Sequence, residues 1–189
     1  MPFYNLSLVD RLMPSGRTHD RITLWTLPLV AGLVQVMVQR STLTLMICGG
    51  FLFGGLMMGP DLDTHSIHYK RWGIFRWIWL PYRHSMRHRS SWFHGPIMGT
   101  TVRVLYLILW LGLVSLIGVA TVNELTQIGW SWSQLGQFWL RQFYRYHLEM
   151  LALFAGLELG AFSHYTADWL VSGYKRRKSK RAKRRKKSN

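Results

Sequence analysis

The sequence predicts an all-α protein that is embedded in a membrane as a helical bundle of about four spans. Of its 189 residues 49% are hydrophobic and 17% are charged, but the two kinds are segregated along the chain. Four long apolar segments alternate with polar stretches, and each approaches or exceeds the length that crosses a bilayer core. We therefore expect a membrane domain, residues 1–174, followed by a polybasic tail, residues 175–189.

The first two apolar segments predict a helical hairpin. The first segment, Ile22 to Val38, is not followed by a small-residue cleavage site in a suitable position. We therefore expect a retained helix and no signal peptide. The second segment, Thr42 to Met58, is uncharged and would span roughly 25 Å, near the lower limit for crossing a membrane. Residues 39–41 would form the tip of the hairpin. Glycines in the second segment would let another helix approach closely. These are Gly49, Gly50, Gly54 and Gly55.

The second half of the chain predicts two more spans with an interfacial helix between them. Ile97 to Val122 is long enough to cross a bilayer, and Arg103 near one end would snorkel to the interface. The fourth segment, about 147–171, contains several ionisable residues and fits a span least well. Between them, residues 129–146 place aromatic and leucine side chains on one helical face, which is typical of a helix at the membrane surface.

The distribution of Lys and Arg predicts the orientation in the membrane, because basic residues next to spans accumulate in the cytoplasm. With four spans the two termini lie on the same side of the membrane. That side would hold Arg11, Arg17 and Arg21, the basic residues of 70–89 and the whole tail. The other side would hold only Arg40, Arg141 and Arg145. We therefore expect an integral membrane protein with both termini in the cytoplasm.

Residues that are able to bind a metal recur at the same end of every predicted span, at the cytoplasmic face. Ionisable groups in such places are costly and tend to be paired or functional. The single cysteine, Cys48, excludes a thiolate cluster, so nitrogen and oxygen atoms would hold the metal, which suits zinc, manganese or iron. The likeliest ligands are His19, Asp61, His94, His164 and Asp168, and second to them are Asp20, Asp63 and His88.

The spacing within these groups leaves alternatives open. His164 and Asp168 are four residues apart, so on a helix either both bind one metal or Asp168 orients the imidazole. A local helical hydrogen bond is the simpler alternative. Asp61 and Asp63 reach one metal only through a turn, and Asp63 would otherwise cap a helix that begins near Thr64.

Other ionisable residues of the chain are expected to have other roles. His65, His68 and His84 have no matching partner at a second span and lie among basic residues, so we expect them to face solvent or lipid headgroups. Glu158, inside the fourth segment, would serve as a buried acid or base or contact Gln35.

Four stretches of the chain carry a resemblance. They are PSGRTHDRIT (14–23), GGLMMGPDLDT (54–64), KRWGIFRWIWLPY (70–82) and HRSSWFHGP (88–96). Through them, most of the chain resembles a bacterial and cyanobacterial family of uncharacterised metal-binding membrane proteins. More distantly, the order of an early His, PDLD, H-R-x(4)-H and H-x-x-x-D resembles membrane-bound metal-dependent hydrolases. Their third motif is closer to H-R-G-x-T-H-S, so the resemblance implies metal binding more firmly than hydrolysis.

The sequence supports two functions from different classes. In the first, the chain is an integral membrane protein that binds a divalent metal ion. If this protein is catalytic, the metal would lower the pKa of a bound water and deliver hydroxide to an ester or phosphoester, with Asp20 or Glu158 as proton carrier. In the second, the same polar residues form a metal-free hydrogen-bonded cluster in a non-enzymatic membrane scaffold. Because a metal that binds only the folded state raises the melting temperature, metal-dependent stability separates the two.

The tail holds 11 of the 24 Lys and Arg residues in a chain of net charge +16. It has almost no apolar side chains and cannot bury a core, so we expect it to be disordered. It would act as a topology determinant or bind anionic lipid headgroups, and RNA is the alternative. Because the tail is tethered at the membrane, we expect membrane lipids as partners and no specific nucleic acid.

Overall fold

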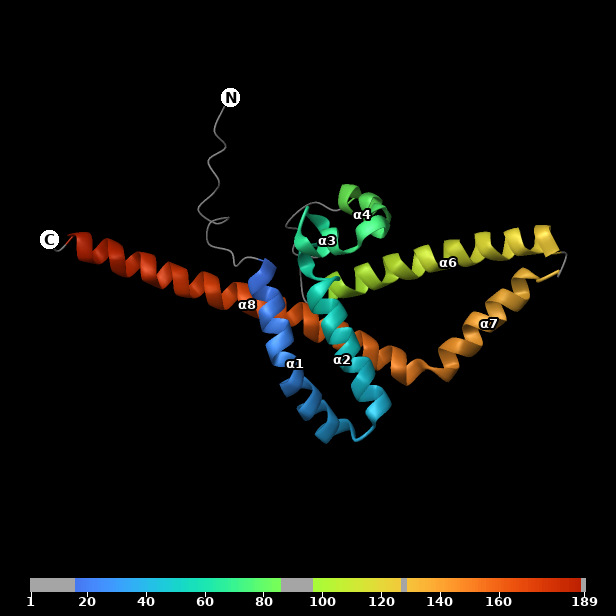
Figure 1. Ribbon diagram of the computed structural model, residues 1–189, viewed down its shortest axis with the longest axis horizontal. Helices are drawn as coiled ribbons and strands as arrows, with labels where there is room; N and C mark the ends of the chain where they lie inside the picture. The colour runs from blue at the N-terminus through green and yellow to red at the C-terminus, as the bar shows by residue number, and fades with distance from the viewer. Residues whose placement is uncertain (1–15, 86–96, 127–128, 188–189) are drawn as a thin grey trace, which may run out of the picture.

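The computed structural model describes residues 16–85, 97–126 and 129–187, which are predominantly helical and, within these ranges, contain no strand. The helices are α1 (Gly16–Val38), α2 (Ser41–Leu56), α3 (Ile67–Arg71), α4 (Trp79–Ser85), α6 (Met98–Thr126), α7 (Trp132–Arg145) and α8 (His147–Lys187). Two 3₁₀ turns, η1 (Pro60–Asp63) and η2 (Gly73–Ile78), precede α3 and α4. In Figure 1, α1 and α2 cross α8, whereas α6 extends away and α7 returns the chain to α8. The expected all-α architecture is confirmed for the described residues.

The helical hairpin that the sequence predicts is present. The chain reverses over Gln39 and Arg40, between the end of α1 and the start of α2. Gln39 has φ 53°, a left-handed backbone conformation that is uncommon for a residue other than glycine and is found mostly in turns. The reversal places α1 and α2 side by side, with both of them against α8 (Figure 1).

Glycines bring α2 and α8 into backbone contact. A Cβ atom at Gly50 or Gly54 would collide with backbone atoms of α8, and one at Gly156 or Gly160 would collide with backbone atoms of α2. Small residues allow such close approach in membranes, where helices associate through van der Waals packing. The close approach predicted from the glycines is therefore confirmed, except that a Cβ at Gly49 would meet no neighbour.

The short helices of the central stretch pack around an aromatic core. Trp79 is fully buried, and its ring contacts those of Trp72, Tyr82 and Tyr106 at centroid distances of 5.1, 5.5 and 5.4 Å. From sequence alone, the aromatic residues of this stretch are expected to rest on the membrane surface as part of an aromatic belt; they are Trp72, Phe75, Trp77, Trp79 and Tyr82. Part of this group instead forms the core that joins the stretch to α6. Trp77, by contrast, is 51% exposed.

The start of α3 differs from the expected cap. Ser66 caps this helix, and its hydroxyl oxygen accepts a hydrogen bond from the Tyr69 N–H at 3.3 Å. Asp63 was expected to cap a helix beginning near Thr64. Instead, Asp63 ends η1, and the chain turns for three residues before α3 begins at Ile67.

Two of the four expected spans are long and apolar enough to cross a membrane. They are Thr18–Val38, with mean hydropathy 1.5, and Met98–Thr126, with mean hydropathy 2.3. Large apolar side chains on both are exposed, among them Trp25 and Ile117. With 16 residues, α2 is shorter, and polar residues interrupt the apolar surface of α8. The structure thus supports membrane association more firmly than a count of four spans.

The expected interfacial helix is present as the separate amphipathic helix α7. It begins with a capping box, in which Ser131 and Gln134 each accept the other's backbone N–H with their side-chain oxygens, at 3.2 and 2.8 Å. Leu135 is buried, whereas Arg141 is exposed. Its placement at a membrane surface stays a prediction.

The tail and Arg103 differ from expectation. α8 continues without a break to Lys187, so the backbone of residues 175–187 is helical where we expected disorder. Lys, Arg and Ala are strong helix formers, and extending an existing helix avoids the cost of nucleation. Arg103 was expected to snorkel to the interface, but it is only 1% exposed and donates a hydrogen bond to the Thr100 hydroxyl at 3.1 Å.

Candidate metal centre

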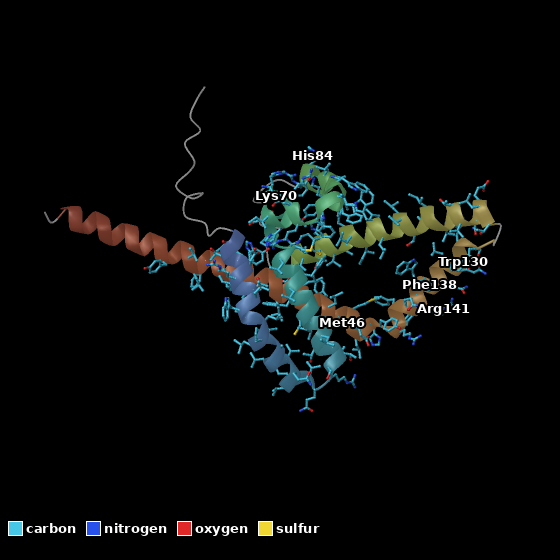
Figure 2. All side chains as sticks on the ribbon, in the orientation of Figure 1. Met46, Lys70, His84, Trp130, Phe138 and Arg141 are labelled. Carbon is cyan, nitrogen blue, oxygen red and sulfur yellow. The ribbon has the colours of Figure 1, made fainter. Side chains whose placement is uncertain are left out.

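Four separate elements bring histidines and carboxylates together. α1 contributes His19, η1 contributes Asp61, α3 contributes His68, and α8 contributes His164 and Asp168. The three histidines are almost completely buried, with exposed fractions of 2 to 3%. The close crossing of α2 and α8 makes this convergence possible, because it holds the turn after α2 against α8. Figure 2 shows the crowding of side chains next to the labelled Lys70 of α3.

The first group of donors consists of His19, His164 and Asp168. The two imidazole rings stack face to face, with centroids 3.6 Å apart and planes 4° from parallel. Asp168 Oδ1 lies 3.1 Å from His19 Nε2, and Asp168 Oδ2 lies 3.4 Å from His164 Nδ1. Asp168 faces the His164 ring because it follows His164 by four residues on one helix. It also faces His19 because α1 packs against α8. One ligand atom from each residue lies within 4.8 Å of the others, a spacing that one metal ion can span.

The second group consists of Asp61, His68 and His164. Asp61 Oδ2 lies 3.6 Å from His164 Nε2, and the His68 ring meets the His164 ring edge-on, with centroids 5.1 Å apart. Ligand atoms of these residues also lie within 4.8 Å of one another. Gly59 makes the arrangement possible, since a Cβ atom there would collide with the His68 ring.

The buried nitrogens of this cluster lack ordinary hydrogen-bond partners within the described part of the chain. They are Nδ1 of His19, Nδ1 of His68 and both ring nitrogens of His164. The 3.4 and 3.6 Å contacts of His164 are longer than the usual 2.7–3.2 Å of an N–H···O hydrogen bond. A buried polar group without a partner costs about 1–3 kcal/mol and calls for an explanation such as a bound ion. These residues therefore fit a divalent metal ion.

The protonation state of His68 also suits metal binding. Burial is the main cause that lowers the pKa of His68 to about 4, and the nearby His164 and Arg71 contribute to the same shift. The imidazole is thus neutral at physiological pH and keeps the lone pair that a metal requires. Our expectation that His68 faces solvent or headgroups is wrong, since it is 2% exposed, whereas His65 and His84 are exposed as expected.

Asp20 forms an ion pair beside the cluster. Both of its carboxylate oxygens accept hydrogen bonds from the Arg71 guanidinium, which also donates to the Leu56 carbonyl at 2.8 Å. Such a bidentate pair is strong and specific in geometry. It ties α1 to α3 and to the end of α2, so Asp20 serves to position the elements that carry His19 and His68. A role for Asp20 as a ligand stays a prediction.

The remaining predicted ligands are Asp63, His88 and His94. Asp63 belongs to neither group, although it shares η1 with Asp61. His88 and His94 lie outside the described residues. Of the eight predicted ligands, the structure thus brings together His19, Asp61, His164 and Asp168.

Glu158 of α8 contacts the N-terminal end of α6. Its Oε1 accepts a hydrogen bond from the Ile97 N–H at 2.7 Å, and a carboxylate there interacts favourably with the helix dipole. Its Oε2 is buried and has no hydrogen-bond partner among the described residues.

The fold and the cluster together define a helical protein with apolar, exposed helices and a His/Asp cluster that fits a metal ion. Residues 14–178 match the family described as "Uncharacterized metal-binding protein (DUF2227)", and the chain belongs to this family. An uncharacterised protein of Aquifex aeolicus (strain VF5) is 39% identical over 59 residues, which are 31% of this chain and 41% of that relative. The match thus spans less than half of the relative. No solved structure matches the chain.

Membership of the family confirms the metal-binding part of the resemblance that the sequence motifs carry. The comparisons do not bear on the more distant resemblance to membrane-bound hydrolases or on a cyanobacterial distribution. Both stay predictions.

Proposed function

We propose that this protein is an integral membrane metal-binding protein whose site binds divalent metal at the cytoplasmic ends of its spans. The observation that carries the proposal is the convergence of three buried imidazoles and two carboxylates from four elements of the chain. Buried nitrogens without hydrogen-bond partners in the described part of the chain support it further. Imidazole and carboxylate donors suit zinc, manganese or iron.

The membrane placement rests on two kinds of observation. α1 and α6 have the length and apolar composition of spans, and α2 and part of α8 would complete a four-span bundle. The surplus of Lys and Arg at both ends of the chain and between residues 70 and 89 favours the cytoplasm for that face. The candidate site draws its residues from the start of α1, from η1 and α3 after α2, and from the middle of α8. In the proposed four-span arrangement this level of the bundle would lie at the cytoplasmic face.

Hydrolysis of an ester or phosphoester, such as that of a lipid, is the activity such a site would support. A bound divalent ion supplies an activated water at neutral pH. Among the chain's own residues, Asp20 is a poor candidate for a proton carrier because the Arg71 guanidinium binds both of its carboxylate oxygens. Glu158 is the better candidate, since one of its oxygens is buried and has no hydrogen-bond partner among the described residues.

Metal analysis tests the proposal. The protein is purified in mild detergent, reconstituted separately with zinc, manganese and iron, desalted and subjected to elemental analysis. We expect at least one ion per chain in the wild type, less in Asp61→Asn, and no change in His65→Gln, which alters an exposed histidine of the same stretch. Substoichiometric metal in the wild type with all three metals would favour the metal-free scaffold.

We also propose that the tail binds anionic lipid headgroups. Its 11 basic residues form the C-terminal part of α8. In the proposed four-span arrangement they would begin at the membrane surface. Attraction to an anionic surface is worth about 1 kcal/mol for each basic residue near it. RNA is the alternative partner and would bind with a steep dependence on salt.

A further inference from the structure

His164 lies between the two groups of donors and belongs to both. Its Nδ1 faces Asp168 at 3.4 Å, and its Nε2 faces Asp61 at 3.6 Å. The two nitrogens of an imidazole ring carry their lone pairs or protons in diverging directions, so one ion cannot bind both of them. The ring therefore divides the cluster into two halves.

Each half has the composition of a complete metal-binding set. On the Nδ1 side, His164 is joined by His19 and Asp168, and on the Nε2 side by His68 and Asp61. Each set contains two imidazoles and one carboxylate, the combination that holds zinc in several hydrolases and iron in many oxygenases.

We infer that the centre binds two divalent ions, one on each side of His164, and that the imidazole of His164 bridges them. This inference rests on the proposed function, because it requires that the cluster binds metal. A neutral imidazole has one lone pair and one N–H. Binding of the second ion therefore displaces the ring proton of His164 to solvent, and the resulting imidazolate donates one lone pair to each ion.

The lack of hydrogen-bond partners at both ring nitrogens of His164, among the described residues, favours two ions over one. With one ion, the other nitrogen would keep its proton and should donate it to a carboxylate, as metal-binding histidines usually do. Both nitrogens are buried, however, and neither has a hydrogen-bond partner within the described ranges. A second ion accounts for both nitrogens at once, whereas a single ion leaves a buried N–H whose facing carboxylate oxygen, at 3.4 or 3.6 Å, is farther away than in an ordinary hydrogen bond.

Zinc stoichiometry provides the first test. The wild-type protein in detergent is loaded with zinc, desalted and analysed, beside His68→Gln, His19→Gln and the exposed control His65→Gln. We expect two ions in the wild type and in the control and one ion in each of the other variants, since each loses a donor from one half only. One ion in the wild type would overturn this inference but leave the proposed function intact, and no ion would overturn both.

Electron paramagnetic resonance provides a second test that needs no variant. The wild type is loaded with copper(II), and its spectrum is compared with that of protein loaded with one equivalent. Two ions bridged by an imidazolate couple magnetically, so we expect the isolated copper signal to weaken and broaden as the second equivalent binds. Two bound ions with an uncoupled spectrum would show that His164 does not join them and would overturn the bridge.

Discussion

Acid should destabilise the metal-free protein through His68. The pKa of this residue falls from an ordinary value of 6.5 to about 4 in the folded state, chiefly because the ring is buried. Between these values the unfolded chain binds a proton that the folded protein does not, so the free energy of unfolding decreases as pH falls. The full difference of about 2.5 pKa units corresponds to about 3 kcal/mol. This loss begins near pH 6.5 and is complete just below pH 4.

The assay is denaturant-induced unfolding in detergent, after treatment with a chelator, at a series of pH values between 7 and 4. His68→Gln keeps a polar side chain of similar reach that cannot take up a proton in this range. Its stability should therefore fall less steeply with acid than that of the wild type, and His65→Gln, at an exposed position, should behave like the wild type. Equal pH dependence in the wild type and His68→Gln would refute the reasoning, because other histidines would then carry the whole effect.

Three further predictions concern packing, topology and the tail. Gly54→Val should destabilise the protein by about 1–3 kcal/mol in thermal or chemical unfolding, because the new side chain would push α2 away from α8. The control Gly49→Val should change stability much less, because a Cβ atom there meets open space. Equal effects of the two substitutions would argue against the close crossing of the helices. Alkaline phosphatase fused after Asn189 should be inactive and a fluorescent protein there should fluoresce, and the opposite result would contradict a cytoplasmic C-terminus. Deleting residues 175–189 should leave the metal content unchanged while weakening binding to vesicles that contain anionic lipid, and loss of metal would show that the tail supports the site.

Much of the helical framework was predictable because it follows from local sequence. Apolar runs separated by a short polar tip predict the hairpin of α1 and α2, and the glycines of α2 predict its close approach to another helix. The contact between His164 and Asp168 follows from helical spacing alone. The meeting of His19 and Asp61 with His164 was predictable from their recurrence at one end of the predicted spans.

The features that sequence analysis missed depend on contacts between distant segments. His68 lies among basic residues, and only the turn after Asp61 folds its ring back against Gly59 and His164. The only local signal was the closeness of a histidine to PDLD. Likewise, the burial of Arg103 requires that the central stretch cover the start of α6, which no pattern within α6 indicates.

The helical backbone of residues 175–187 has a different cause. Composition predicts that this segment cannot form a core, and this is compatible with a helix that continues from α8. A lack of apolar residues therefore did not imply a lack of secondary structure.

Thermal unfolding at increasing concentrations of free zinc tests most directly whether the His/Asp cluster is a metal centre. An ion that binds only the folded state stabilises it by about 2.7 kcal/mol at 100 times the dissociation constant. We predict that the melting temperature of the wild type rises with zinc concentration, that His65→Gln follows it, and that His164→Gln, which removes the ligand shared by both halves, does not. A melting temperature of the wild type that does not change with zinc, manganese or iron would contradict the account.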